Sequence, residues 1–102
     1  MLQIQCDVNE ARHQLRLTGE LTIYTAAELM PQLLQTLAEC TALDLHLGQV
    51  SELDTAGLQQ LLLARREASR QGKALRLVEP SAATREVLAF TRLEAEFPTS
   101  DV

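Results

Sequence analysis

The sequence has few aromatic residues, no tryptophan and no excess of positive charge. Among its 102 residues are one tyrosine and two phenylalanines, so a core must be built mainly from aliphatic side chains. Lysine and arginine number 9 against 14 aspartates and glutamates, which gives a formal charge of −5. Nucleic acids and anionic membrane surfaces attract proteins with an excess of basic residues, so this balance argues against both as partners.

Cysteines and long apolar runs are also lacking. Cys6 and Cys40 are far apart in the sequence and have no metal-ligand spacing, so we expect both to be reduced and buried. No apolar run approaches the length of a membrane helix and no signal peptide is recognisable, so we expect a cytoplasmic protein without membrane insertion. The length fits a single domain over residues 1–102, as a monomer or weak dimer.

Strands are predicted where apolar residues alternate with polar ones. This period of two occurs over residues 2–8 and 12–18, which can pair as a hairpin, with Gly19 closing the second strand. Further strands are predicted over residues 43–47 and 75–78. The sequence therefore contains at least four strands.

Helices are predicted in the three intervals that follow the second, third and fourth strands. Thr25 to Glu28 resembles a capping box at the start of a helix that ends near Glu39. Pro31 cannot donate a backbone hydrogen bond, which predicts a bend or a late start of this helix. Residues 55–71 have the longest helical pattern, and Ser81 is expected to cap the last helix.

The predicted order of elements is β-β-α-β-α-β-α. Strands separated by helices pair in parallel through right-handed crossovers, whereas the first hairpin is antiparallel. We therefore predict an α/β sandwich with a four- to five-stranded mixed sheet, covered mainly on one face by three to four helices. The tail, residues 96–102, is expected to be frayed.

The stretch SELDTAGL, residues 51–58, begins the longest predicted helix and admits two interpretations. In the first, Asp54 or Thr55 is the N-cap, and Gly57 only lets the helix approach a strand closely. In the second, Thr55 is a phosphoacceptor, because the free amides and positive dipole end of a helix N-terminus stabilise a phosphate. The residues alone leave both interpretations open.

Several stretches, in their order and spacing, resemble the STAS domain, the fold of bacterial anti-sigma-factor antagonists. These stretches are GEL (19–21), TAAEL (25–29), VSELDTAGL (50–58) and QGKALRLVEPSAATREVLAFTRLEAEF (71–97). The most specific element is the family's motif of Asp, Ser or Thr, a small residue, Gly and Leu, which matches residues 54–58 at a predicted strand-to-helix turn. The resemblance covers essentially the whole chain.

The resemblance implies a β-α sandwich with no cofactor, no metal and no catalytic activity of its own. The phosphorylated residue of the family falls on Thr55, its preceding aspartate on Asp54 and its glycine on Gly57. The usual partner is an anti-sigma factor, a histidine-kinase-like serine/threonine kinase that phosphorylates the antagonist, and a phosphatase reverses the modification. The residues expected to contact such a partner are Leu21, Thr22, Ile23 and Tyr24 in one loop, and Asp54, Thr55, Ala56, Gly57 and Leu58 at the helix start.

The chain departs from the family pattern in two places. Antagonists usually have G-x-L-D after the second strand, whereas Thr22 stands at the acidic position here. His46 stands where the third strand of the family commonly has aspartate. In the loop after Thr22, Ile23 and Tyr24 are either a buried staple onto the first helix or an exposed anchor for a partner, and the residues do not decide between these.

No pattern of catalytic residues is present. The sequence has no Gly-rich phosphate loop, no suggestive carboxylate pair and no Ser-His-Asp or Cys-His set, so we expect no enzymatic activity. Two alternatives of another class stay open: a constitutive subunit of a lipid-transport ATP-binding-cassette complex, and an adaptor of a chemosensory system. Their partner would be a transporter or chemosensory subunit, and their assembly would not depend on phosphate at Thr55.

Overall fold

The strands form one mixed sheet in the order β1-β2-β3-β4-β5. The computed structural model describes residues 2–9, 12–92 and 99–100. Strand β1 pairs with β2 in antiparallel fashion, and all the other neighbouring strands are parallel. The strand bounds are β1 (Gln3–Asn9), β2 (Arg12–Leu21), β3 (Ala42–Leu53), β4 (Ala74–Val78) and β5 (Thr99–Ser100).

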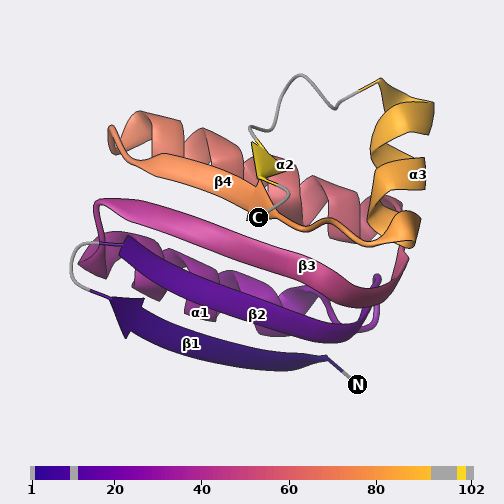
Figure 1. Ribbon diagram of the computed structural model, residues 1–102, viewed down its shortest axis with the longest axis horizontal. Coiled ribbons are helices and arrows are strands. Elements are labelled where there is room, and N and C mark those ends of the chain that lie inside the picture. The colour runs from indigo at the N-terminus through magenta and orange to yellow at the C-terminus, as the bar shows by residue number, and fades with distance from the viewer. Residues whose placement is uncertain (1, 10–11, 93–98, 101–102) are drawn as a thin grey trace.

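Three helices connect the parallel part of the sheet (Figure 1). Their bounds are α1 (Ala26–Glu39), α2 (Thr55–Arg70) and α3 (Ala82–Thr91). In Figure 1, α1 and α2 lie side by side behind the sheet. Helix α3 lies at one end of the sheet, where it contacts β3. The predicted α/β sandwich and its element order are therefore confirmed, with β5 as a short fifth strand.

The core lies between the sheet and the helices, and leucine is its main residue type. Alternate residues of the central strands, such as Leu15 and Leu17 of β2 and Leu45 of β3, are fully or almost fully buried on this side. Leu29, Leu33 and Leu37 of α1 and Leu61 of α2 face them and are fully buried. The alternation read from the sequence thus identifies the core face of each central strand.

Two strands run further than their alternation predicts. Strand β2 continues past Gly19 to Leu21, because Gly19 has a φ of 114° and lies next to a register shift in the β2–β3 ladder. Such a bulge lets a strand bend and continue, and glycine adopts positive φ easily. Strand β3 runs from Ala42 to Leu53, well beyond the predicted residues 43–47. Both extensions end beside the start of α2.

The predicted capping box at the start of α1 is wrong. Thr25 precedes the helix but its side chain makes no capping hydrogen bond to it, so there is no capping box. Its hydroxyl instead accepts from the Thr22 amide and donates to the Glu20 carbonyl. The helix begins at Ala26, five residues before Pro31, so of the two effects predicted for Pro31 the late start is wrong and the bend stays a prediction. At α3, in contrast, the predicted cap is confirmed: Ser81 accepts a hydrogen bond from the Thr84 amide.

Two further expectations concern the cysteines and the end of the chain. Cys40 is buried as predicted, but Cys6 on β1 is exposed, which corrects the expectation for that cysteine. In the predicted frayed tail, Thr99 and Ser100 pair with Leu77 and Val78 of β4, and the rest of residues 96–102 lies outside the described residues.

Candidate functional site

Asp54 is the N-cap of α2 and ties the helix to the loop that follows β2. Its backbone is extended, and its Oδ1 accepts a hydrogen bond from the Gly57 amide at 2.9 Å. Its Oδ2 accepts from the Ile23 amide, also at 2.9 Å, and its own amide donates to the Leu21 carbonyl. The hydrogen bond from Gly57, helped by the one from Ile23, lowers the pKa of Asp54 and favours the carboxylate.

Gly57 is required because the first turn of α2 packs directly against the end of β2. A Cβ atom at Gly57 would lie 2.2 Å from the Leu21 carbonyl oxygen and 2.8 Å from Leu53 Cδ1. No real Cβ tolerates such distances, so any larger residue would push the helix away from the strand. The sequence-based interpretation of Gly57 as a close-approach residue is confirmed.

The loop between β2 and α1 is held by hydrogen bonds of two buried threonines. The Thr22 amide donates to Thr25 Oγ1, and the Tyr24 amide donates to Thr22 Oγ1. Both threonines are 7% exposed, whereas Ile23 is 68% and Tyr24 is 90% exposed. The loop is therefore internally fixed and presents two large apolar side chains to solvent, which excludes their role as a buried staple.

Thr55 is exposed as the first residue of α2, and the cap is supplied by Asp54 instead. The structure therefore removes the capping interpretation of Thr55 while leaving its hydroxyl at the helix mouth. Ala56 is half-buried and Leu58 is 6% exposed at this turn.

The nine predicted contact residues fall into two groups. Ile23, Tyr24 and Thr55 are exposed, and Asp54 and Ala56 are half-buried. The other four, Leu21, Thr22, Gly57 and Leu58, are buried, and contact of the nine residues with a partner stays a prediction. The four buried residues hold the helix mouth and the loop together, and Leu58 also forms part of a groove floor.

That groove lies between the start of α2 and α3 and has a volume of about 660 Å³. Its apolar walls are Leu53, Leu58, Val87 and Phe90, and its polar lining is Asp54, Thr55, Glu86 and Thr91. The two charged residues in its lining are both acidic. Phe90 is 90% exposed on one wall, although it is one of the few aromatic residues of the chain.

Sequence reasoning missed the contribution of α3 to this region. The scarcity of aromatic residues singled out Tyr24 as a candidate anchor, and the same signal applies to Phe90. Only the packing of α3 against the end of β3 places Phe90 beside the helix mouth.

Acidic side chains gather next to the helix mouth. Glu20 of β2 and Glu52 of β3 are register partners in the parallel ladder, and Asp54 follows two residues later. A hydrogen bond with Glu20, together with the charge of that neighbour, raises the pKa of Glu52. Thr55 therefore sits among carboxylates, and any further negative charge there adds to an already negative surface.

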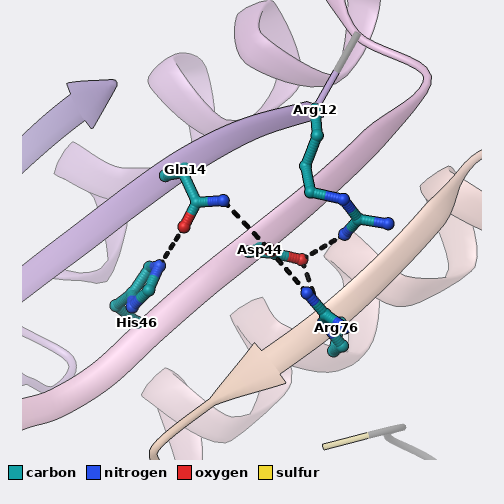
Figure 2. A network of polar contacts seen from close by, with 5 residues as sticks. All are labelled: Arg12, Gln14, Asp44, His46 and Arg76. Atoms are coloured by element: carbon teal, nitrogen blue, oxygen red, sulfur yellow. Dashed lines mark hydrogen bonds and ion pairs between the residues drawn. The ribbon is translucent and has the colours of Figure 1, made fainter. Parts of the chain in front are cut away.

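A second polar cluster lies on the sheet face opposite the helices (Figure 2). The Asp44 carboxylate, 3% exposed, accepts hydrogen bonds from Arg12, Gln14 and Arg76 on the two neighbouring strands. Burial is the largest single effect on Asp44 and opposes its ionisation, but the two arginines together outweigh it and lower its pKa. This cluster ties β2, β3 and β4 together.

The histidine that replaces the usual family aspartate belongs to the same sheet face. His46 contacts the side-chain oxygen of Gln14, and burial, helped by the charge of Arg16, lowers its pKa. His46 therefore lies in the Asp44 cluster, which shares no residue with the groove at the mouth of α2.

Among the described residues, no group of three or more metal-binding side chains is arranged around a common point. No helix in the described ranges is long and apolar enough to cross a membrane.

Comparisons with known proteins agree with this arrangement. A family model described as "Mlab, STAS domain" matches residues 4–98 of the chain. A comparison with curated proteins finds no matching sequence.

Solved structures of similar fold include two anti-sigma-factor antagonists. An anti-sigma-factor antagonist from Mycobacterium paratuberculosis has a TM-score of 0.88 at 22% identity, covering 100% of this chain and 87% of its own. The Bacillus cell-fate determinant SpoIIAA in its phosphorylated form has a TM-score of 0.74 at 20% identity, covering 99% and 92%. Its unphosphorylated form gives 0.76 at 20% identity, covering 100% and 89%. At these identities the similarity establishes the fold.

Proposed function

Because this chain belongs to the STAS domain family, we propose that it is a non-enzymatic regulatory protein of the bacterial cytoplasm. It binds a partner protein at the mouth of α2, as an anti-sigma-factor antagonist does, and phosphate on Thr55 releases the partner. The observation that carries this proposal is the exposed Thr55 at a helix N-terminus where Asp54 already supplies the cap. A residue that is not needed to start the helix is available for modification.

The docking surface consists of the exposed residues around this hydroxyl. On one side of Thr55, Asp54 holds the loop that presents Ile23 and Tyr24. On the other side lies the groove with Phe90 on its wall. Exposed aromatic side chains next to an apolar groove are typical anchors of protein–protein interfaces. The acidic neighbours favour a partner whose matching surface is basic.

Phosphorylation would act on docking rather than on folding. A kinase partner would transfer the terminal phosphoryl group of ATP to Thr55 Oγ1, which loses its proton, and ADP would leave. The phosphate adds about −1.5 to −2 charges and is well accommodated by the helix N-terminus. At the interface, however, this charge lies beside Asp54, Glu52 and Glu20 and would have to be desolvated against a partner.

Intact-mass spectrometry of the chain from its native cytoplasm tests the switch. We expect an added phosphate in the wild type that is absent from Thr55→Ala. Thr55→Glu should weaken partner binding at least about tenfold, equivalent to about 1.4 kcal/mol, while the melting temperature stays nearly constant. Equal affinity of Thr55→Glu and the wild type would contradict the proposal.

A second candidate is a constitutive subunit of a larger complex, such as a lipid-transport ATP-binding-cassette assembly. The observation that favours it is the apolar character of the surface, because Ile23, Tyr24 and Phe90 all project into solvent. Permanent interfaces are more apolar than transient ones. The wild type separates the candidates, because Thr55→Val would retain a phosphate-free complex under both. A fixed subunit stays bound and never carries phosphate, whereas an antagonist is released from its partner when Thr55 is phosphorylated. A chemosensory adaptor would behave like the fixed subunit, with a different partner recovered.

A further inference from the structure

One margin of the sheet is the outer edge of β1. Figure 1 shows β1 as the outermost strand on this side, with no other described element beyond it. The strand has 7 residues, whereas β5 at the opposite margin has 2. The free edge of a strand presents unpaired amide and carbonyl groups that can pair with another strand. The margin at β1 is therefore a ready position for an additional strand.

Strand β1 lacks the features by which edge strands usually avoid pairing. Between Gln3 and Asn9 there is no proline, lysine or arginine, and the single charged residue is Asp7. Its ladder with β2 is regular throughout, whereas the ladder between β2 and β3 has two register shifts. Natural edges are commonly blunted by short length, proline, lysine or a bulge. This edge is long, regular and open.

The helix-side row of β1 is apolar and only partly covered. Ile4, Cys6 and Val8 lie opposite buried residues of β2. Ile4 packs against the core, but Cys6 is exposed and Val8 is 67% exposed. The helices thus stop short of the margin, which leaves apolar surface uncovered and room for a neighbouring strand.

We propose that a second copy of this chain pairs with β1, antiparallel, about a two-fold axis at Cys6. Cys6 is the middle residue of β1, so it would face Cys6 of the second copy. Ile4 would then face Val8 of the second copy on the helix side, and Gln5 would face Asp7 on the open side. Apolar residues meet apolar ones, an amide meets a carboxylate, and no like charges oppose one another. The two sheets become one continuous sheet.

The second copy is favoured over a foreign strand because a two-fold interface must be self-complementary. The pattern of β1 meets that condition when read in both directions from Cys6. The pairing leaves the docking surface free, since neither the groove lining nor the loop with Tyr24 belongs to β1. A dimer would present two such surfaces, so a multivalent partner would bind it more tightly than a monomer. This inference does not depend on the proposed function.

Sedimentation equilibrium of the full chain over a range of concentrations tests the dimer. We expect a monomer–dimer equilibrium in the wild type and in Cys6→Ala. In Cys6→Lys two ammonium groups would face each other across the axis, so the dissociation constant should rise at least about tenfold. Val8→Lys should act in the same direction, while Leu63→Lys, at a similarly exposed site on α2, should not. A wild type that is monomeric up to about 1 mM, or a dimer indifferent to both β1 lysines, overturns the proposal.

Oxidative cross-linking tests the register. Antiparallel neighbours have Cα atoms about 4.5 or 5.5 Å apart, and both separations lie within the range of a disulfide. Copper phenanthroline, which removes two electrons and two protons from a pair of thiols, should link the wild type through Cys6 of each copy. Peptide mapping should locate the bond, and Val8→Lys should suppress it. A dimer without this bond, or a bond formed equally in Val8→Lys, overturns the proposed pairing.

Discussion

The Asp54 carboxylate links the Ile23 amide to the first turn of α2, with both of its hydrogen bonds at 2.9 Å. Two segments that are thirty-one residues apart in the sequence therefore share a single side chain. Whatever displaces Asp54 must disturb the helix mouth and the loop of Tyr24 together. We therefore expect the helix mouth and this loop to respond together to changes at Asp54.

Replacing Asp54 with alanine should loosen both the start of α2 and the loop of Tyr24. The amide variant Asp54→Asn should loosen only the loop. We expect Asp54→Ala to lower the free energy of unfolding by about 1–2 kcal/mol, through loss of the cap and of the Ile23 hydrogen bond. Asp54→Asn retains a capping oxygen for Gly57. Amide hydrogen exchange should therefore accelerate at Ile23 in both variants but at Gly57 mainly in Asp54→Ala. Equal protection of Ile23 in all three proteins would contradict this role.

Replacement of Gly57 should destabilise the fold more than replacement of Gly72. The Cβ of Gly57→Ala would clash with the Leu21 carbonyl, so we expect a loss of at least about 1–3 kcal/mol from overpacking. Gly72 provides a matched control, because it has a φ of 69° but open space around it. Gly72→Ala should cost only about 1 kcal/mol of backbone strain. Urea unfolding of both variants measures the difference, and equal losses would count against the close approach.

The Asp44 cluster should make stability depend on pH in the acid range. Because the folded state lowers the pKa of Asp44, its carboxylate contributes stability above the unfolded value of about 3.9, and this contribution disappears as the pH falls through the lower folded value. We expect Asp44→Asn to lose about 1–3 kcal/mol at pH 7 and correspondingly less at low pH. Thermal unfolding from pH 2 to 7 measures both proteins. Parallel pH profiles for the two would exclude this contribution.

Tyr24 and Phe90 should matter for binding but not for folding. Both side chains are 90% exposed, so truncation to alanine should leave the melting temperature within about 2 °C of the wild type. In the proposed interface each is an anchor, and each alanine variant should weaken partner binding at least about tenfold. Leu63→Ala, on the part of α2 remote from the groove, is the control and should bind normally. Full binding by the double variant Tyr24→Ala, Phe90→Ala would rule out this surface.

The candidate site was only partly predictable, because its residue types lie in one short stretch whereas its shape depends on contacts with β2 and α3. The motif from Asp54 to Leu58 is local, so its position at a strand-to-helix turn follows from the residues themselves. The role of Gly57 depends on a carbonyl of β2, and the groove depends on where α3 packs. The glycine in the first helical turn indicates a close approach to a strand, but neither the identity of that carbonyl nor the position of the groove has a signal in the nearby sequence. The missing capping box shows the same limit, since Thr25 has the right residue type but bonds to Thr22 and Glu20 instead.

The sequence by itself determined the element order, the aliphatic core and the placement of a hydroxyl at the mouth of the longest helix, because periodicity and turn residues are local properties. Only the folded chain shows that the Asp54 carboxylate also binds the Ile23 amide, and that Tyr24 and Phe90 project into solvent. It also shows that β1 ends the sheet with an open edge. These features arise from contacts between distant segments, and such contacts depend on the packing of the whole chain.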